Sequence, residues 1–238
     1  MDKLPAPPKE LAELIERGEV SVSFYDRKPS SQRFEGETRF QYDVKYRFRF
    51  RLRSRNNPAG PSASVTVSSI KISPQNKISV PKRYAHDEIW TEPLVVHEFE
   101  HVKVNSDPRL FLLLRAVVAS IRTVSLDAET LAGNDSATSH ERLISQQIDE
   151  EINRRVAKVT ALVQANNDLL DQVTRHGVAP EYRDTNFFNR LYMEDNLKEQ
   201  NFPIVDTLQI LLKSRRYTRY ANTDNAEPEG KGRDYDEK

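Results

Sequence analysis

The strongest pattern along this chain is an alternation of apolar and polar positions over residues 38–53. In TRFQYDVKYRFRFRLR, every second residue from Phe40 to Leu52 is apolar, and the residues between them are polar or charged. A period of two is typical of a strand with one buried face and one wet face. RNNPAGPS has the composition of a loop, and ASVTVSSIKIS returns as a second strand. These segments predict an antiparallel hairpin over residues 38–73.

Apolar spacing of the helical kind is found in much of the remaining chain. Residues 8–17 predict a short helix with proline at its start and Gly18 after its end, and residues 20–25 predict another strand. A helix is predicted from Pro93 to the break at residues 105–108. The next segment, RLFLLLRAVVASIR, predicts a buried helix because it is apolar almost all round.

A long helix is predicted from Thr138 to Gly177, because one apolar stripe continues through the segment until the glycine. Residues 186–215 predict one or two further helices, interrupted near Pro203. The final segment, NTDNAEPEGKGRDYDEK, is too polar to bury a core and predicts a disordered tail.

Composition narrows the functional classes. The 36 basic and 36 acidic residues cancel, so the whole chain offers no electrostatic attraction for a nucleic-acid partner. No apolar run approaches the roughly 20 residues of a membrane span. The N-terminus MDKLPAPPKE lacks the apolar segment of a signal peptide. Because the chain has no cysteine, only histidine and carboxylate side chains remain as strong metal ligands.

The segment HEFEH places His97 and His101 four positions apart, with Glu98 directly after the first histidine. On a helix, the two imidazoles fall on one face, where both can bind one metal ion. Glu98 then stands where it can take a proton from bound water. This pattern predicts a zinc site, and the alternative interpretation is a charged helix surface.

A catalytic zinc ion takes three protein ligands, so one more is required. Asp107 follows His97 by the ten residues of a known extension of the motif, but an aspartate before Pro108 is also typical of a helix N-cap. His176 is the favoured candidate, although a histidine at a helix end is also explained by the helix dipole. Further candidates are His140, Asp149, Glu150 and Glu151.

Two separated motifs resemble one protein family. HEFEH, followed by the later segment DQVTRHG, is similar to the bacterial domain-of-unknown-function family described as predicted secreted zinc-dependent proteases, which joins HExxH to a YDxxTxHG segment. The likeness spans about residues 36–180 and implies zinc on His97 and His101 with Glu98 as general base. It also implies a functional role for four later residues: Asp171, Thr174, His176 and Gly177. Independently of the resemblance, Asp171 and Thr174 precede His176 at spacings that could orient its imidazole from behind.

The chain departs from that family pattern at two positions. Leu170 stands where the family favours tyrosine, and Glu100 stands where it favours glycine. The resemblance implies a secreted or periplasmic protein, whereas the N-terminus shows no leader, which makes a cytoplasmic location the alternative.

These features predict an α+β fold in which an antiparallel sheet packs against a helical layer that carries the zinc-binding HExxH helix. Residues 1–18 are expected to form an N-terminal extension with a short helix, residues 19–217 a single zincin-like domain, and residues 218–238 a disordered tail. The predicted function is a zinc-dependent peptidase that acts on a peptide or protein substrate. The alternative is a catalytically silent binding or scaffold protein with the same fold. A third hypothesis is a polyanion binder that uses the basic face of residues 45–53.

Overall fold

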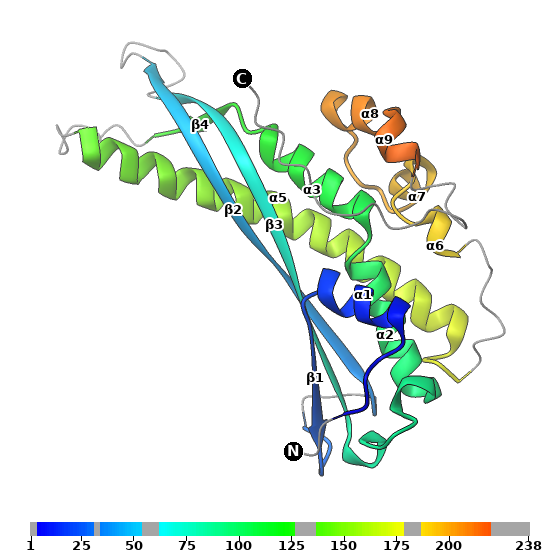
Figure 1. The fold of residues 1–238 in the computed structure, drawn as a ribbon. Coiled ribbons are helices and arrows are strands. Elements are labelled where there is room, and N and C mark those ends of the chain that lie inside the picture. Colours follow the sequence, from blue (N-terminus) through cyan, green and yellow to red (C-terminus); the bar gives the residue numbers. More distant parts are fainter. Residues whose placement is uncertain (1–3, 31–33, 54–61, 127–136, 179–186, 220–238) are drawn as a thin grey trace.

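The computed structural model describes residues 4–30, 34–53, 62–126, 137–178 and 187–219. This part of the chain is an α+β structure in which a mixed sheet packs against helices (Figure 1). The strands are β1 (Val20–Tyr25), β2 (Glu37–Arg53), β3 (Ser62–Pro81) and β4 (Thr123–Ser125).

The sheet has the order β1-β3-β2, with β4 paired to β3. β2 and β4 run antiparallel to β3, whereas β1 runs parallel to it. The predicted antiparallel hairpin is therefore confirmed, but the prediction of a wholly antiparallel sheet is wrong at β1. Alternation within one strand fixes which face is buried and carries no information about the direction of its neighbour. The predicted loop between β2 and β3 falls mainly on residues 54–61, outside the described residues.

β3 continues to Pro81, beyond the predicted end at residue 73. Its pairing register with β2 shifts between Lys45 and Arg47, opposite Ser69, which has a positive φ of 51°. This bulge changes which positions face inward. Odd-numbered residues are buried before it and even-numbered residues after it: Ala63, Val65, Val67, then Ile72, Asn76, Ile78, Val80.

The aromatic face of β2 packs on the core, as the alternation predicts, with Phe40, Tyr42, Val44, Tyr46, Phe48 and Phe50 against it. Leu52 is the exception and is 42% exposed. Lys45, Arg47, Arg49 and Arg51 are exposed on alternate positions. The aromatic rings therefore lie away from these cations, and β2 does not combine cations with a stacking platform for bases.

The main helices lie close to their predicted positions. They are α1 (Lys9–Arg17), α2 (Pro93–Asn105), α3 (Pro108–Ala119) and α5 (Ala137–Thr174). Two short 3₁₀ turns, η1 (Lys82–Tyr84) and η2 (Ile89–Thr91), connect β3 to α2. The C-terminal part forms short helices, more than were predicted: α6 (Phe187–Arg190), α7 (Glu194–Glu199), α8 (Asp206–Leu212) and α9 (Arg215–Thr218).

Two clusters of buried apolar residues hold these elements together. The larger cluster joins the sheet to α3, α5 and the C-terminal helices. The smaller cluster joins α1, β1 and the end of β3 to α2, with Leu14, Ile78 and Val95 among its members. α2 contributes Val104 to the first cluster and Phe99 to the second, so both cores fix its position.

No helix in the described ranges combines the length and apolar character needed to cross a bilayer. The predicted tail lies almost entirely in residues 220–238, outside the described residues.

Candidate metal centre

Polar stripes on two helices face each other across the site. On α2, positions 97, 101 and 105 follow a spacing of four, which places these side chains on one face. On α5, positions 167, 171 and 174 are spaced by four and then three residues, which also places their side chains on one face. His97 contacts Asp171 while His101 contacts Asn167, so the two helices run in opposite directions where they meet.

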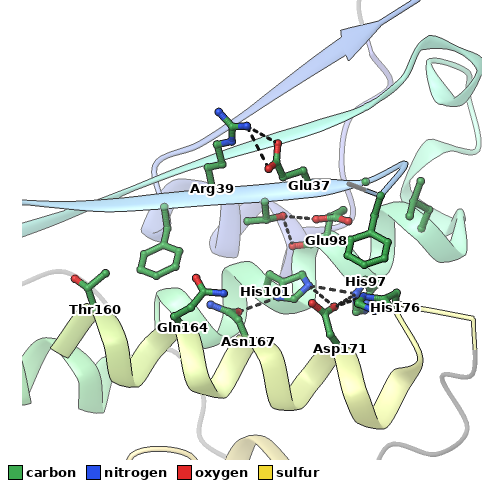
Figure 2. A pocket seen from close by; sticks show the side chains of 15 residues that line it. Glu37, Arg39, His97, Glu98, His101, Thr160, Gln164, Asn167, Asp171 and His176 are labelled. Atoms are coloured by element: carbon green, nitrogen blue, oxygen red, sulfur yellow. Dashed lines mark hydrogen bonds and ion pairs between the residues drawn. The ribbon is translucent and has the colours of Figure 1, made fainter. Parts of the chain in front are cut away.

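Three ligand atoms converge between these stripes (Figure 2). Nε2 of His97 lies 3.2 Å from Nε2 of His101, and Asp171 Oδ1 lies 3.0 Å and 3.2 Å from those nitrogens. Four ligands arranged tetrahedrally with bonds of about 2.0 Å are about 3.3 Å apart, so the triangle fits such an ion closely. This buried group could bind a metal ion. Within the described ranges, no other group of three or more histidines and carboxylates has its ligand atoms close enough together to do the same.

The outer nitrogen of His97 faces one hydrogen-bond acceptor and one carboxylate. Its Nδ1 lies 3.4 Å from the Thr174 hydroxyl and 3.8 Å from Glu100 Oε2. The Thr174 hydroxyl donates its proton to the Leu170 carbonyl at 2.8 Å, so it can only accept from His97. Nδ1 therefore carries the proton in the neutral ring, and Nε2 presents a lone pair to the site.

His101 is held in the same way. Its Nδ1 lies 2.9 Å from Oδ1 of Asn167, whose amide nitrogen donates to Asn105. The amide oxygen of Asn167 therefore accepts from Nδ1, and Nε2 faces the site with a lone pair. Two imidazole lone pairs and one carboxylate oxygen meet at one point, and such an arrangement is stable only around a cation, either a proton or a metal ion.

The ionisation of the site agrees with that conclusion. Burial lowers the pKa of His97, but hydrogen bonds with Asp171 and Glu100 outweigh it and raise the pKa to about 9. Burial raises the pKa of Asp171, yet hydrogen bonds with His101 and His97 overcome this and hold the pKa well below its ordinary value. The carboxylate is thus anionic and ready to bind a cation.

Glu98 lies on α2 but points toward β2. The residue is 3% exposed, and its carboxylate accepts a hydrogen bond of 2.6 Å from the Thr38 hydroxyl (Figure 2). Burial raises the pKa of Glu98, against the opposing influence of His101 and Thr38. Gly36 provides the necessary space, because a Cβ at that residue would lie 2.1 Å from Glu98 Oε1.

His176, the predicted third ligand, lies beside the triangle and outside the group of three. Its Nδ1 is 3.2 Å from Asp171 Oδ1, and its ring stacks on Phe34 at 4.0 Å. The side chain is 45% exposed. The group of three therefore contains Asp171, which was expected to support an imidazole, and His176 contacts Asp171 from the pocket side. Thr174, which was expected to support the His176 ring, lies instead behind His97.

The other candidate ligands are engaged elsewhere. Asp107 caps α3 and forms an ion pair with Arg109 at 2.6 Å, as its N-cap interpretation predicts. Asp149 accepts from Tyr46, and Glu151 pairs with arginines of α5. Glu150 accepts from glutamines on α5, and His140 lies near the start of that helix, also outside the group.

A pocket of about 480 Å³ opens beside the triangle. One wall is Gly36 with the first part of β2, from Glu37 to Phe40, and the opposite wall is α5, with Thr160, Gln164 and Asn167 (Figure 2). His97, Glu98, His101, Asp171 and His176 all line it. The pocket therefore gives a ligand access to the candidate metal position and to Glu98.

Asn105 and Asn167 support the site and were not singled out from the sequence. The available signal was their spacing, since Asn105 continues the stripe of His97 and His101, and Asn167 precedes Asp171 by one turn. Comparisons with known proteins add no assignment to this geometry. No family model, curated protein or solved structure matches the chain.

Proposed function

We propose that this protein is a zinc-dependent hydrolase in which His97, His101 and Asp171 bind the ion. The observation that carries the proposal is the convergence of two imidazole lone pairs and one carboxylate oxygen at mutual distances of 3.0–3.2 Å. Two neutral nitrogens and one oxygen in a tetrahedral arrangement suit zinc, and three protein ligands leave one position for water or substrate.

Glu98 is the proposed general base. A zinc ion held by this group would supply Lewis-acid chemistry and acidify a bound water. Glu98 follows His97 on the same helix and lines the same pocket, and burial raises its pKa toward the range useful for proton transfer. In the proposed reaction its carboxylate accepts the proton of the attacking water and returns it to the leaving group.

A peptide is the proposed substrate. Within the described residues β2 pairs only with β3, so its other edge is open along the pocket wall. An extended peptide can add to such an edge through backbone hydrogen bonds, which would carry its scissile carbonyl past the metal position. The order of HEFEH and DQVTRHG supports assigning the chain, as part of this proposal, to the predicted secreted zinc-dependent proteases.

Metal analysis of the purified protein tests the site. We expect close to one zinc ion per chain, a large loss of affinity in Asp171→Asn, and nearly unchanged affinity in His176→Gln. The two variants separate the ligand proposed from the geometry from the ligand predicted by sequence spacing. Wild-type protein that takes up no zinc from a metal buffer would exclude the hydrolase, and a loss of zinc only in His176→Gln would restore the sequence prediction.

Hydrolysis requires its own measurement. Zinc-loaded protein is incubated with a mixture of unstructured peptides, and the products are identified by mass spectrometry, with Glu98→Gln as the matched variant. We expect Glu98→Gln to retain zinc and to lose at least about 100-fold in rate, the scale of a general base.

A zinc-binding protein without hydrolytic activity is the second candidate. The observation that favours it is the burial of Glu98, which is 3% exposed and whose carboxylate is hydrogen-bonded to Thr38. Under this alternative, the wild type and Glu98→Gln bind zinc equally and neither cleaves any peptide in the mixture.

A further inference from the structure

We infer that a chain of three buried asparagines determines which ring nitrogen of His101 carries the proton, and that Asn76 on β3 is a positioning residue for the metal centre. The inference rests on the proposed use of His101 as a metal ligand. This series of hydrogen-bonded amides begins at the Gly18 carbonyl, next to the end of α1. It passes through side chains of β3, α2 and α5 before it reaches His101.

Each hydrogen bond of this amide chain is short. Asn76 Nδ2 donates to the Gly18 carbonyl at 2.7 Å, and Asn105 Nδ2 donates to Asn76 Oδ1 at 3.0 Å. Asn167 Nδ2 donates to Asn105 Oδ1 at 2.8 Å, and its own Oδ1 lies 2.9 Å from His101 Nδ1. The three asparagines are between 0% and 6% exposed, so solvent does not compete for these bonds.

The direction of these hydrogen bonds is set by the Gly18 carbonyl, at the end farthest from His101. A backbone carbonyl can only accept, so the amide nitrogen of Asn76 must face Gly18 and its oxygen must face Asn105. The second hydrogen of Asn76 Nδ2 is directed to the Ser106 hydroxyl at 3.3 Å, which further holds this orientation. Asn105 must then present its nitrogen to Asn76 and its oxygen to Asn167.

The same constraint passes to the histidine. Asn167 uses its nitrogen toward Asn105, so its oxygen is the atom that faces His101, and only a protonated Nδ1 can donate to it. Reversal of one amide would oppose two oxygens or two N–H groups at its contacts, which is costly in a buried site. The Gly18 carbonyl therefore fixes the lone pair on His101 Nε2, the atom 3.2 Å from both His97 Nε2 and Asp171 Oδ1.

Nitrogen-15 NMR of the metal-free, labelled protein reads this tautomer directly, because protonated and unprotonated ring nitrogens differ widely in chemical shift. In its neutral form, we expect the His101 ring to carry its proton on Nδ1 only. A wild-type spectrum with the proton on Nε2 overturns the inference. Because no metal is needed, this result is independent of whether the protein proves to be a zinc hydrolase.

Two variants at Asn76 test whether the distant residue controls the ring. Asn76→Leu removes the acceptor for Asn105, so we expect a mixture of His101 tautomers and about tenfold weaker zinc binding. Asn76→Asp keeps an acceptor for Asn105 and should retain the wild-type tautomer. Asn166→Leu is the matched control, since Asn166 is equally buried on α5 but bonds to Asn196; we expect it to lose stability without any change at His101.

The outcomes separate positioning from simple packing. If Asn76→Leu keeps the proton wholly on Nδ1, Asn167 alone orients His101 and the role of Asn76 is overturned. If Asn76→Leu does not fold, a tautomer change in Asn76→Asp still contradicts the argument, because that variant keeps the acceptor for Asn105. Absence of zinc binding in the wild type would remove the hydrolase proposal while leaving the tautomer result in place.

Discussion

At the scale of single residues, two glycines provide the space that the site requires. Gly177 has a φ of +80°, and a Cβ at this residue would lie 2.8 Å from Cβ and 2.9 Å from Cγ of His97. We expect Gly177→Ala to destabilise the protein by about 1–3 kcal/mol, because strain at positive φ adds to the clash. Displacement of the His97 ring should also weaken zinc binding by about tenfold or more, as measured by competition with a chelating dye.

Val178→Ala is the control for that variant. Val178 follows Gly177 directly and is 81% exposed, so its truncation should change neither property by more than about 0.5 kcal/mol. If Gly177→Ala binds zinc as tightly as the wild type, the contact with His97 does not constrain the ring.

Gly36 has the corresponding role for Glu98. An added methyl group would lie 2.1 Å from Glu98 Oε1, so the carboxylate would have to leave the Thr38 hydroxyl. For a peptidase, we expect Gly36→Ala to retain zinc while kcat changes by about tenfold or more. Thr38→Ser keeps the hydroxyl and should behave as the wild type. Equal kcat values in Gly36→Ala and the wild type would remove Glu98 from the proposed base position.

The sequence pointed to two members of the group that could bind a metal ion, and it favoured His176 where the structure brings Asp171 into the group. Spacing alone brings His97 and His101 together, because four residues make one helical turn. Asp171 and His176 both follow from the second motif, but their roles depend on where α5 ends. The chain leaves the helix through positive φ values at Arg175 and His176, which carry His176 past the triangle, whereas Asp171 still faces α2 from within the helix.

At the scale of elements, helices and strands were predicted best where their hydrophobic pattern was longest. Long periodic segments, such as β2 and α5, were predicted well because many positions repeat one signal. β3 was predicted too short because the bulge at Ser69 reverses its inward positions and Pro74 interrupts its apparent strand character. Pro74 is tolerated because pairing with β1 begins only at Asn76, so the missing N–H costs no bond on that side.

The N-terminal helix was predicted as part of an extension, and its contacts allow a direct test of that boundary. Leu14 of α1 is 3% exposed within the cluster that also contains Val95 and Val102 of α2. We expect Leu14→Ala to reduce the free energy of unfolding by about 2–4 kcal/mol, measured by urea denaturation. Glu13→Ala on the exposed side of α1 is the control, and equal unfolding curves for both variants would show that α1 contributes nothing to the domain.

At the scale of the whole molecule, the site places many polar side chains in the buried interior. Five polar side chains of α2 are buried between the two apolar clusters: His97, Glu98, Glu100, His101 and Asn105. Buried polar groups are stable only when paired, so the fold depends on the hydrogen bonds and charges of the centre. The sequence could not reveal this dependence, because the partners come from α5, β2 and β3 and meet only after the sheet and helices have assembled. Stability should therefore respond to pH and to metal.

The sign of the pH dependence follows from His97. Its pKa is about 9 in the folded protein and 6.5 ordinarily, so its proton stabilises the metal-free fold fully below about pH 6.5 and this contribution is lost as pH rises through 9. The shift corresponds to about 3 kcal/mol. Asp171 has the opposite sign, because its lowered pKa contributes stability above its ordinary value of 3.8 and loses it in stronger acid. We expect metal-free protein to be most stable between these ordinary values and to weaken from pH 6.5 to 9.

Zinc should restore the stability that the metal-free protein loses at alkaline pH. In the proposed centre a zinc ion would replace the proton between His97 and Asp171, so zinc affinity should rise from pH 6.5 to 9, and excess zinc at 100 times its dissociation constant should add about 2.7 kcal/mol. Thermal unfolding at several pH values, with zinc and with a chelator, measures both effects. His86→Gln changes a histidine whose side chain is 40% exposed and should leave both profiles unchanged. Metal-free stability that stays constant from pH 6.5 to 9 would show that the proton on His97 does not hold the two helices together.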